Sequence, residues 1–83
     1  MKLLYFAWVR ERIGLTEEDV DPPGSVTTAG ELIDWLRGRG PAYAHALAEP
    51  AAIRVAIDRV HAARDARLDG ASEIALFPPM TGG

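Results

Sequence analysis

The order of apolar and polar positions changes along the chain, and each change predicts a different element of structure. Residues 2–9, KLLYFAWV, are apolar on both alternating sets, which is typical of an interior strand with both faces covered. The VRERIG segment that follows predicts a short helical turn or a loop, which Gly14 can close. An acidic stretch then predicts a short edge strand near residues 17–20, and a Pro-Pro-Gly sequence ends it.

The clearest helix signal is an S/T-x-x-E capping box at residues 28–31, in which the two side chains satisfy free backbone N–H groups. Apolar residues then recur at helical spacing, at Ala29, Leu32, Ile33 and Leu36. We therefore expect a helix over residues 29–37, ended by a glycine. A second short helix over residues 41–48 would pack through Tyr43 and Leu47.

The second half of the chain changes to a period of two. Apolar side chains alternate with polar or small ones over residues 53–58, which predicts a half-buried strand. Asp58 and Arg59 can form the next turn, because Asp tolerates turn conformations by bonding its own backbone. A second strand is then expected over residues 60–64. After the LDGAS loop, EIALF predicts a final strand over residues 73–77.

Together these elements predict an α+β fold, with a mixed sheet of four to five strands, one main helix packed on one face, and one or two short helices. Such helices can cover only one face, yet the first and last strands are apolar on both. If the helix covers Leu3, Tyr5, Ile74 and Leu76, the outward set is Leu4, Phe6, Ala75 and Phe77. A contiguous exposed apolar patch usually marks a binding surface. The alternatives are that this parity is reversed or that loops cover the patch.

The composition limits the classes of function. The 83 residues are expected to form one domain, and 48% of them are hydrophobic, which is enough for a folded chain. Twelve acidic residues against nine basic ones argue against generic nucleic-acid binding, and we interpret the arginines of residues 54–67 as the solvated face of a hairpin. The longest apolar run, residues 3–9, is far shorter than the roughly 20 residues of a membrane-spanning helix. No cleavable leader precedes it, so we expect a cytoplasmic protein without a membrane partner.

Side chains suited to catalysis are few. Because the chain has no cysteine, it has no thiolate nucleophile and no Cys-based metal site. His45 and His61 stand alone without metal-ligand spacing, and no phosphate-binding loop, nucleophile elbow or plausible carboxylate pair is present. We therefore expect no metal site, no tightly bound cofactor and no catalysis by this chain alone. The reactive group that remains is the α-carboxylate of Gly83.

The ending FPPMTGG is suited to carrying that carboxylate into the active site of another protein. Gly82 and Gly83 make a thin, flexible stem, and the two prolines before them favour an extended approach. We expect residues 1–77 to form the folded domain and residues 78–83 to form an extended, flexible tail. A free carboxylate is a poor acyl donor, so chemistry at Gly83 needs an activating partner and ATP.

The sequence at this point resembles a known family, the ubiquitin-like β-grasp sulfur carriers, and among them the small subunits of molybdopterin synthases. The resemblance covers nearly the whole chain. It includes the opening LLYFAWVRERIG, the capped helix TTAGELIDWL, the strand VAID, and the adjoining segments LDGASEIALF and FPPMTGG. The last two segments together are the most specific part, whereas a terminal Gly-Gly alone would be a weak signal. The resemblance implies a β-grasp fold.

The resemblance also implies what the tail does. An adenylyltransferase of the ubiquitin-activating type would use ATP to adenylate Gly83, and a sulfur donor protein would convert the adenylate to a thiocarboxylate. The tail would then enter the large subunit of molybdopterin synthase, in a heterotetramer, and give its sulfur to cyclic pyranopterin monophosphate during molybdenum cofactor biosynthesis. The implied partner contacts are Phe6, Arg10, Phe77, Pro78, Pro79, Met80 and Thr81, with Gly82 giving access.

The sequence departs from the family pattern at a few positions. Asp58 stands where asparagine is frequent, His61 stands where an apolar residue is frequent, and residues 69–72 replace a tighter acidic glycine turn. These departures bear on turn geometry and on partner contacts, and they leave other functions open. One alternative is a sulfur carrier for thiamine, cysteine or tRNA thiolation. Another is a ubiquitin-like interaction module or protein modifier whose tail is inert or conjugated to lysine.

Overall fold

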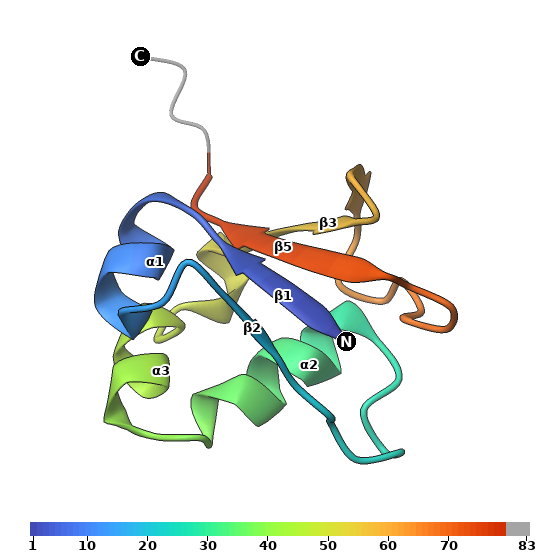
Figure 1. Ribbon diagram of the computed structural model, residues 1–83, viewed down its shortest axis with the longest axis horizontal. Coiled ribbons are helices and arrows are strands. Elements are labelled where there is room, and N and C mark those ends of the chain that lie inside the picture. Colours follow the sequence, from blue (N-terminus) through green and yellow to red (C-terminus); the bar gives the residue numbers. More distant parts are fainter. Residues whose placement is uncertain (80–83) are drawn as a thin grey trace.

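The protein folds into a mixed five-stranded sheet with its helices gathered on one side, and the computed structural model describes residues 1–79 (Figure 1). The elements in chain order are β1 (Lys2–Tyr5), α1 (Ala7–Ile13), β2 (Glu17–Asp19), α2 (Ala29–Arg37), α3 (Pro41–Ala46), a 3₁₀ turn η1 (Pro50–Ala52), β3 (Arg54–Ile57), β4 (Val60–Ala62) and β5 (Glu73–Phe77). The strand order is β2-β1-β5-β3-β4. The central pair β1 and β5 is parallel, and the other pairs are antiparallel. The predicted mixed α+β sheet with one main helix is confirmed.

Helix α2 has the predicted bounds and the predicted cap. The Glu31 backbone N–H donates to the Thr28 hydroxyl over 3.3 Å, and the Thr28 N–H donates to the Glu31 carboxylate over 3.0 Å. These two bonds satisfy donors that the first turn of a helix otherwise leaves free. The apolar stripe of α2 is fully buried against the sheet. The second helix, α3, is also confirmed, with Leu47 buried just after its end and Tyr43 half-buried.

The first strand is shorter than predicted. The sequence predicted a strand through Val9, but β1 ends at Tyr5 and Ala7 begins α1. Ala7 has φ of +52°, a left-handed value that turns the chain out of the sheet. The buried pair in α1 is Val9 and Ile13, which are four residues apart as a helix requires. A continuous apolar run hides this helical spacing, and the prediction was wrong for that reason.

The strand after the hairpin turn is also shorter than predicted. Strand β4 ends at Ala62, and backbone carbonyls in the segment that follows accept hydrogen bonds from the start of α2. The Gly30 backbone N–H donates to the Arg64 carbonyl over 2.8 Å, and the Ala29 N–H donates to the Ala66 carbonyl over 3.0 Å. A side chain at Gly30 would bring a Cβ within 3.3 Å of that Arg64 oxygen. A residue larger than glycine would therefore require the Arg64 segment to shift by a few tenths of an ångström. The carbonyls of this segment complete the helix cap.

The core lies between the sheet and the helices. The predicted inward residues of the two central strands are fully buried, and these are Leu3, Tyr5, Ile74 and Leu76. They pack against a helix layer that includes Leu32, Leu36 and Leu47. Within residues 1–79, every buried side-chain polar atom has a hydrogen-bond partner. No helix in this part of the chain has the length and apolar character needed to cross a membrane.

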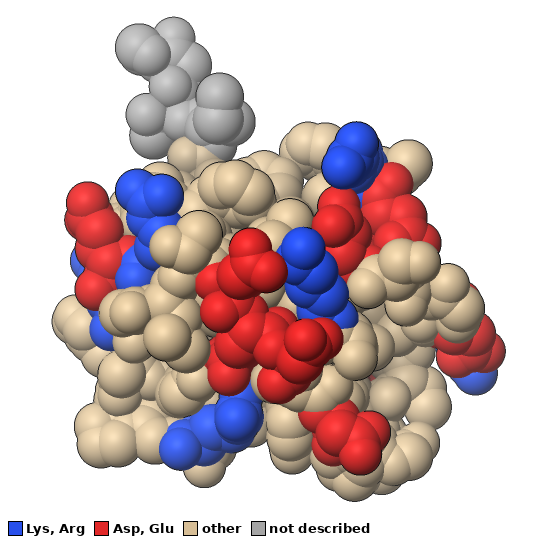
Figure 2. Space-filling view, viewed as in Figure 1, with Lys and Arg blue, Asp and Glu red and all other residues tan. Residues whose placement is uncertain are grey.

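One polar cluster ties the edge strand to the helix layer. The Glu18 carboxylate on β2 accepts hydrogen bonds from the hydroxyls of Tyr5 (2.7 Å) and Tyr43 (2.6 Å), and from the Arg39 guanidinium (3.1 Å). Figure 2 shows acidic side chains gathered across the middle of the view, over β2. The edge strand is therefore acidic toward solvent, which disfavours pairing with another strand, and it is fixed from behind by these hydrogen bonds.

The open sheet face and the tail root as a candidate functional site

The face of the sheet opposite the helices is largely apolar near its centre. Its middle row follows from the strand register, in which Leu4 lies opposite Ala75, Ala75 opposite Ala56, and Ala56 opposite His61. The Phe6 side chain, just past β1, is 46% exposed. The predicted outward parity is therefore confirmed, and the apolar surplus lies on the face without helices.

The tail root, which we define as Phe77 with Pro78 and Pro79, lies at the end of this face. It begins at the last residue of β5, a central strand held between β1 and β3, and it lies beside the start of α1 (Figure 1). The Phe6 backbone N–H donates to the Leu76 carbonyl over 3.2 Å, and this bond continues the β1 pairing to the last residues of β5. Phe6 and Phe77 therefore lie at the ends of adjacent strands, on the face where the sequence analysis expects a docking surface.

Arg10 lies one helical turn from Phe6. Its backbone N–H donates to the Phe6 carbonyl over 3.3 Å, and this bond ties the first turn of α1 to the end of β1. The Arg10 side chain is exposed and forms no ion pair with any residue up to position 79. Phe6 and the first turn of α1, which carries Arg10, thus lie beside the tail root, and the contacts of these residues with a partner stay a prediction (Figure 1). The other predicted site residues, Met80, Thr81, Gly82 and Gly83, lie outside the described residues.

His61 belongs to this site, although sequence analysis treated it as isolated. Its ring packs against the Phe77 ring with centroids 5.4 Å apart and planes at 81°, a favourable edge-to-face geometry. A recess of about 310 Å³ is lined by Arg54, Val55, His61, Ala62 and Phe77. The turn at residues 58–59 is the sequence signal that could have placed His61 at this site. A two-residue hairpin turn sets the register of β3 and β4, and the register fixes which β4 side chains share the outward face of β3.

The charges on this face are divided between its two ends. At the end away from the tail root, Lys2 pairs with Glu17 over 3.4 Å and Arg59 pairs with Glu73 over 3.3 Å. At the tail root, the Arg54 guanidinium has no ion-pair partner within residues 1–79. The face is therefore neutralised at one end and cationic at the other.

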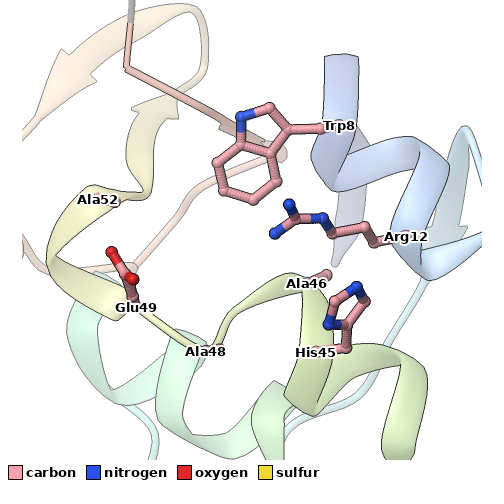
Figure 3. Close-up of a pocket in the computed structure, with 7 residues that line it drawn as sticks. All are labelled: Trp8, Arg12, His45, Ala46, Ala48, Glu49 and Ala52. Carbon is pink, nitrogen blue, oxygen red and sulfur yellow. The ribbon is translucent and has the colours of Figure 1, made fainter.

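A second hollow lies on the helical side, between α1 and the segment from α3 to η1. Figure 3 shows Arg12 and His45 on one side of it and Glu49 on the other, and the Arg12 guanidinium lies 4.3 Å from the centroid of the Trp8 ring. This arrangement holds no nucleophile with an adjacent base. Across residues 1–79, no three His, Asp or Glu side chains lie close enough to hold a metal ion. Among residues 1–79, the feature that remains as a candidate site is the apolar open face with the tail root.

The perturbed pKa values lie elsewhere in the molecule. Burial and the neighbouring Glu18 raise the pKa of the Tyr5 and Tyr43 phenols, and hydrogen bonds from the Thr27 backbone and side chain lower the pKa of the Glu31 carboxyl. Active sites often concentrate such shifts, but these groups form the helix cap and the β2 cluster. These titratable groups therefore stabilise the fold and do not belong to the tail root.

Comparison with known proteins places this geometry in context. The model of the ThiS family matches residues 3–83. The chain is 32% identical over 83 residues to the molybdopterin synthase sulfur carrier subunit of Haemophilus influenzae, a match that covers 100% of this chain and 99% of that protein.

Solved structures agree with that match. The fold is similar to the crystal structure of SAMP1 from Haloferax volcanii, with a TM-score of 0.73 and 30% identity, covering 100% of this chain and 98% of that one. It is also similar to a Pyrococcus furiosus protein assigned as molybdopterin converting factor, subunit 1, with a TM-score of 0.73 and 25% identity over 95% of each chain. The predicted ubiquitin-like β-grasp fold is therefore confirmed.

Proposed function

This chain belongs to the ThiS family, and on that premise we propose that it is a sulfur carrier whose C-terminal Gly83 holds the transferred sulfur as a thiocarboxylate. The observation that carries the proposal is the position of the tail root. The apolar open face ends where the central strand β5 runs into the FPPMTGG segment, so a protein that docks on Phe6 and Phe77 also receives the tail. The 32% identity to a sulfur carrier subunit supports the same role.

The proposed chemistry takes place on the tail, in the active sites of partner proteins. A carboxylate oxygen of Gly83 attacks the α-phosphate of ATP, which gives an acyl-adenylate and releases pyrophosphate. Sulfide, or the persulfide of a donor protein together with a reducing thiol, then displaces AMP and leaves sulfur in place of one oxygen. ATP is consumed by the adenylyltransferase, and this chain supplies the acyl group and the docking face.

The proposed acceptor is the large subunit of a molybdopterin synthase, acting on cyclic pyranopterin monophosphate in molybdenum cofactor biosynthesis. The name of the Haemophilus influenzae relative supports this choice. Two small and two large subunits in one heterotetramer are expected, with the tail root and Arg10 at the contact. Carriers for thiamine, cysteine or tRNA thiolation would share the tail but dock on a different acceptor. Co-purification from the source organism distinguishes these acceptors.

Intact-mass spectrometry tests the proposal. The protein is incubated with its adenylyltransferase, ATP and sulfide, and the expected product has one oxygen replaced by sulfur, located to Gly83 by fragmentation. A variant lacking Gly82 and Gly83 serves as the control and is expected to keep its mass. An unchanged mass for the wild-type chain, or full synthase activity from the truncated chain, would overturn the proposal.

A second candidate function is that of a protein modifier. It is favoured by the similarity to a Haloferax volcanii structure described as small archaeal modifier protein 1, with 29% identity and a TM-score of 0.73. In that case Gly83 would be joined to lysine side chains of other proteins. Mass spectrometry of cell extracts would then find isopeptide remnants that end in Gly-Gly. Such adducts without thiocarboxylate would favour this second function.

A further inference from the structure

The recess at the tail root combines two polar groups with one aromatic wall. Register places Arg54 of β3 directly opposite Phe77 of β5, and His61 of β4 packs against the same Phe77 ring at a centroid distance of 5.4 Å. Three adjacent strands therefore line a recess of about 310 Å³, and Arg54, His61 and Phe77 are its polar and aromatic side chains. All three side chains lie on the open face that a partner would cover.

The charge in this recess is unmatched within the described chain. Lys2 and Arg59, the cations at the far end of the face, have carboxylate partners, whereas Arg54 has none among residues 1–79. The protein as a whole carries a formal charge of −3, and its docking face nevertheless presents this guanidinium without an ion-pair partner among residues 1–79, in addition to that of Arg10 on α1. Covering an unpaired guanidinium with an apolar surface is costly, because the ion loses its water without gaining a partner.

The N–H donors of Arg54 and His61 determine which kind of group fits the recess. A guanidinium offers a planar pair of N–H donors that matches a carboxylate. The ring of His61, held across the Phe77 ring, can add a further N–H donor to the same recess. The nearest acidic side chain on the outward face of β5 is Glu73, and its carboxylate is already paired with Arg59. A carboxylate from outside the chain is the group that this recess fits.

We propose that Arg54 and His61 form a cationic recess beside the tail root that receives an aspartate or glutamate of the protein into which the tail inserts, and that this pair helps to choose that partner. The inference rests on the proposed function, because it assigns the recess to the acceptor of the sulfur carrier. Complementary charge of this kind sets specificity and the rate of association more than total affinity. Phe6 and Phe77 supply most of the binding energy through apolar contacts, and Arg54 and His61 determine which partner binds.

The test measures binding of the full-length chain to the molybdopterin synthase large subunit of the source organism, by titration calorimetry at low and moderate salt. Arg54→Glu is expected to weaken binding by about thirtyfold or more and to remove most of its salt dependence. His61→Leu is expected to weaken it by about threefold to tenfold, the loss of one hydrogen bond. Arg37→Glu is the matched control, because this substitution changes the net charge equally. Arg37 lies on α2, away from the open face, and pairs with Asp34.

Each outcome decides a different point. Wild-type protein that fails to bind the large subunit overturns the proposed acceptor. Wild-type binding that Arg54→Glu weakens no more than Arg37→Glu does overturns the recess alone. Charge reversal of the partner's acidic residues, one at a time, is expected to restore binding to Arg54→Glu at one position. If Arg54→Glu instead changes only self-association in sedimentation experiments, the recess is occupied by a second copy and the proposal is wrong. Circular dichroism confirms that each variant is folded.

Discussion

The carboxylate of Glu18 on β2 accepts a hydrogen bond from the hydroxyl of Tyr43 on α3, with 2.6 Å between the oxygens. Burial by itself raises the pKa of the Glu18 carboxyl, but hydrogen bonds from Tyr43, Tyr5 and Arg39 outweigh it and hold the pKa below its ordinary value of 4.5. Burial, with Glu18 as the acceptor, raises the pKa of the Tyr43 phenol above 10.0. The charged carboxylate and the neutral phenols therefore stabilise one another.

Glu18→Gln is expected to lower the free energy of unfolding at pH 7 by about 1–3 kcal/mol, because the charged acceptor of three donors is lost. A lowered carboxyl pKa stabilises the fold above pH 4.5, and that contribution is lost as the pH falls through the folded pKa. The raised phenol pKa values act in the opposite direction, so stability also falls as the pH rises above 10.0.

Urea denaturation at several pH values measures both effects. Glu17→Gln is the matched control, since Glu17 lies on the outward side of the same strand in an exposed pair with Lys2 and is expected to change stability by less than about 1 kcal/mol. Equal stability of Glu18→Gln and the wild-type chain at pH 7 would show that the cluster adds nothing to the fold.

Phe77→Ala is expected to weaken binding of the sulfur acceptor by about thirtyfold, because buried aromatic side chains near the centre of an interface carry much of its binding energy. Calorimetric titration with the large subunit measures the change. Val60→Ala is the matched control: Val60 is 68% exposed and, as the neighbour of His61 on β4, has the opposite parity. A Phe77→Ala chain that binds as tightly as Val60→Ala would exclude the open face as the docking surface.

Gly82→Leu is expected to reduce the rate of thiocarboxylate formation by about a hundredfold while the free energy of unfolding stays unchanged. A branched side chain next to Gly83 misplaces the reacting carboxylate in the narrow channel of an activating enzyme, and small displacements of this kind are costly. Time-resolved mass spectrometry gives the rate. Thr81→Ser, a conservative change one residue earlier, is the control. A normal rate for Gly82→Leu would mean that the glycine is not needed for access.

The parts of the fold that the sequence predicted well are those with local signals. Helix α2 carries its own cap at Thr28 and its own apolar stripe, so its bounds follow from a few adjacent residues. The boundary between β1 and α1 carries no such signal. All residues around Ala7 are apolar, and the turn there uses a positive φ at a residue that is not glycine. The strand prediction extended too far because periodicity cannot separate the two elements in such a run.

The candidate site likewise has one part that local sequence signals predict and one part that they do not. The outward parity of Phe6 and Phe77 follows from alternation within each strand, and the register confirmed it. The contact between His61 and Phe77 depends on β3 lying between β4 and β5, and this order is a property of the whole sheet. Sequence reasoning about His61 alone therefore missed it. The role of Gly83 stays a prediction, because it rests on the sequence and on the family.

Asp58 offers a last test, in the turn that sets the position of His61. Asp58 and Arg59 have φ values of +48° and +72°, the left-handed pair that a tight hairpin turn requires. The Asp58 carboxylate also accepts hydrogen bonds from the Ser72 and Glu73 backbone N–H groups, both over 2.9 Å. Asparagine adopts the same backbone region readily and keeps the accepting oxygen, whereas alanine adopts it at a greater cost and has no side-chain oxygen.

Asp58→Ala is therefore expected to lower the free energy of unfolding by about 1–3 kcal/mol, and Asp58→Asn to change it by less than about 0.5 kcal/mol. Urea denaturation measures both variants, and Asp65→Ala, at an exposed position without these bonds, is the control. Because the turn fixes the β3–β4 register, Asp58→Ala is also expected to weaken docking through His61. If Asp58→Asn destabilised the chain as much as alanine does, the charge and not the accepting oxygen would hold the turn.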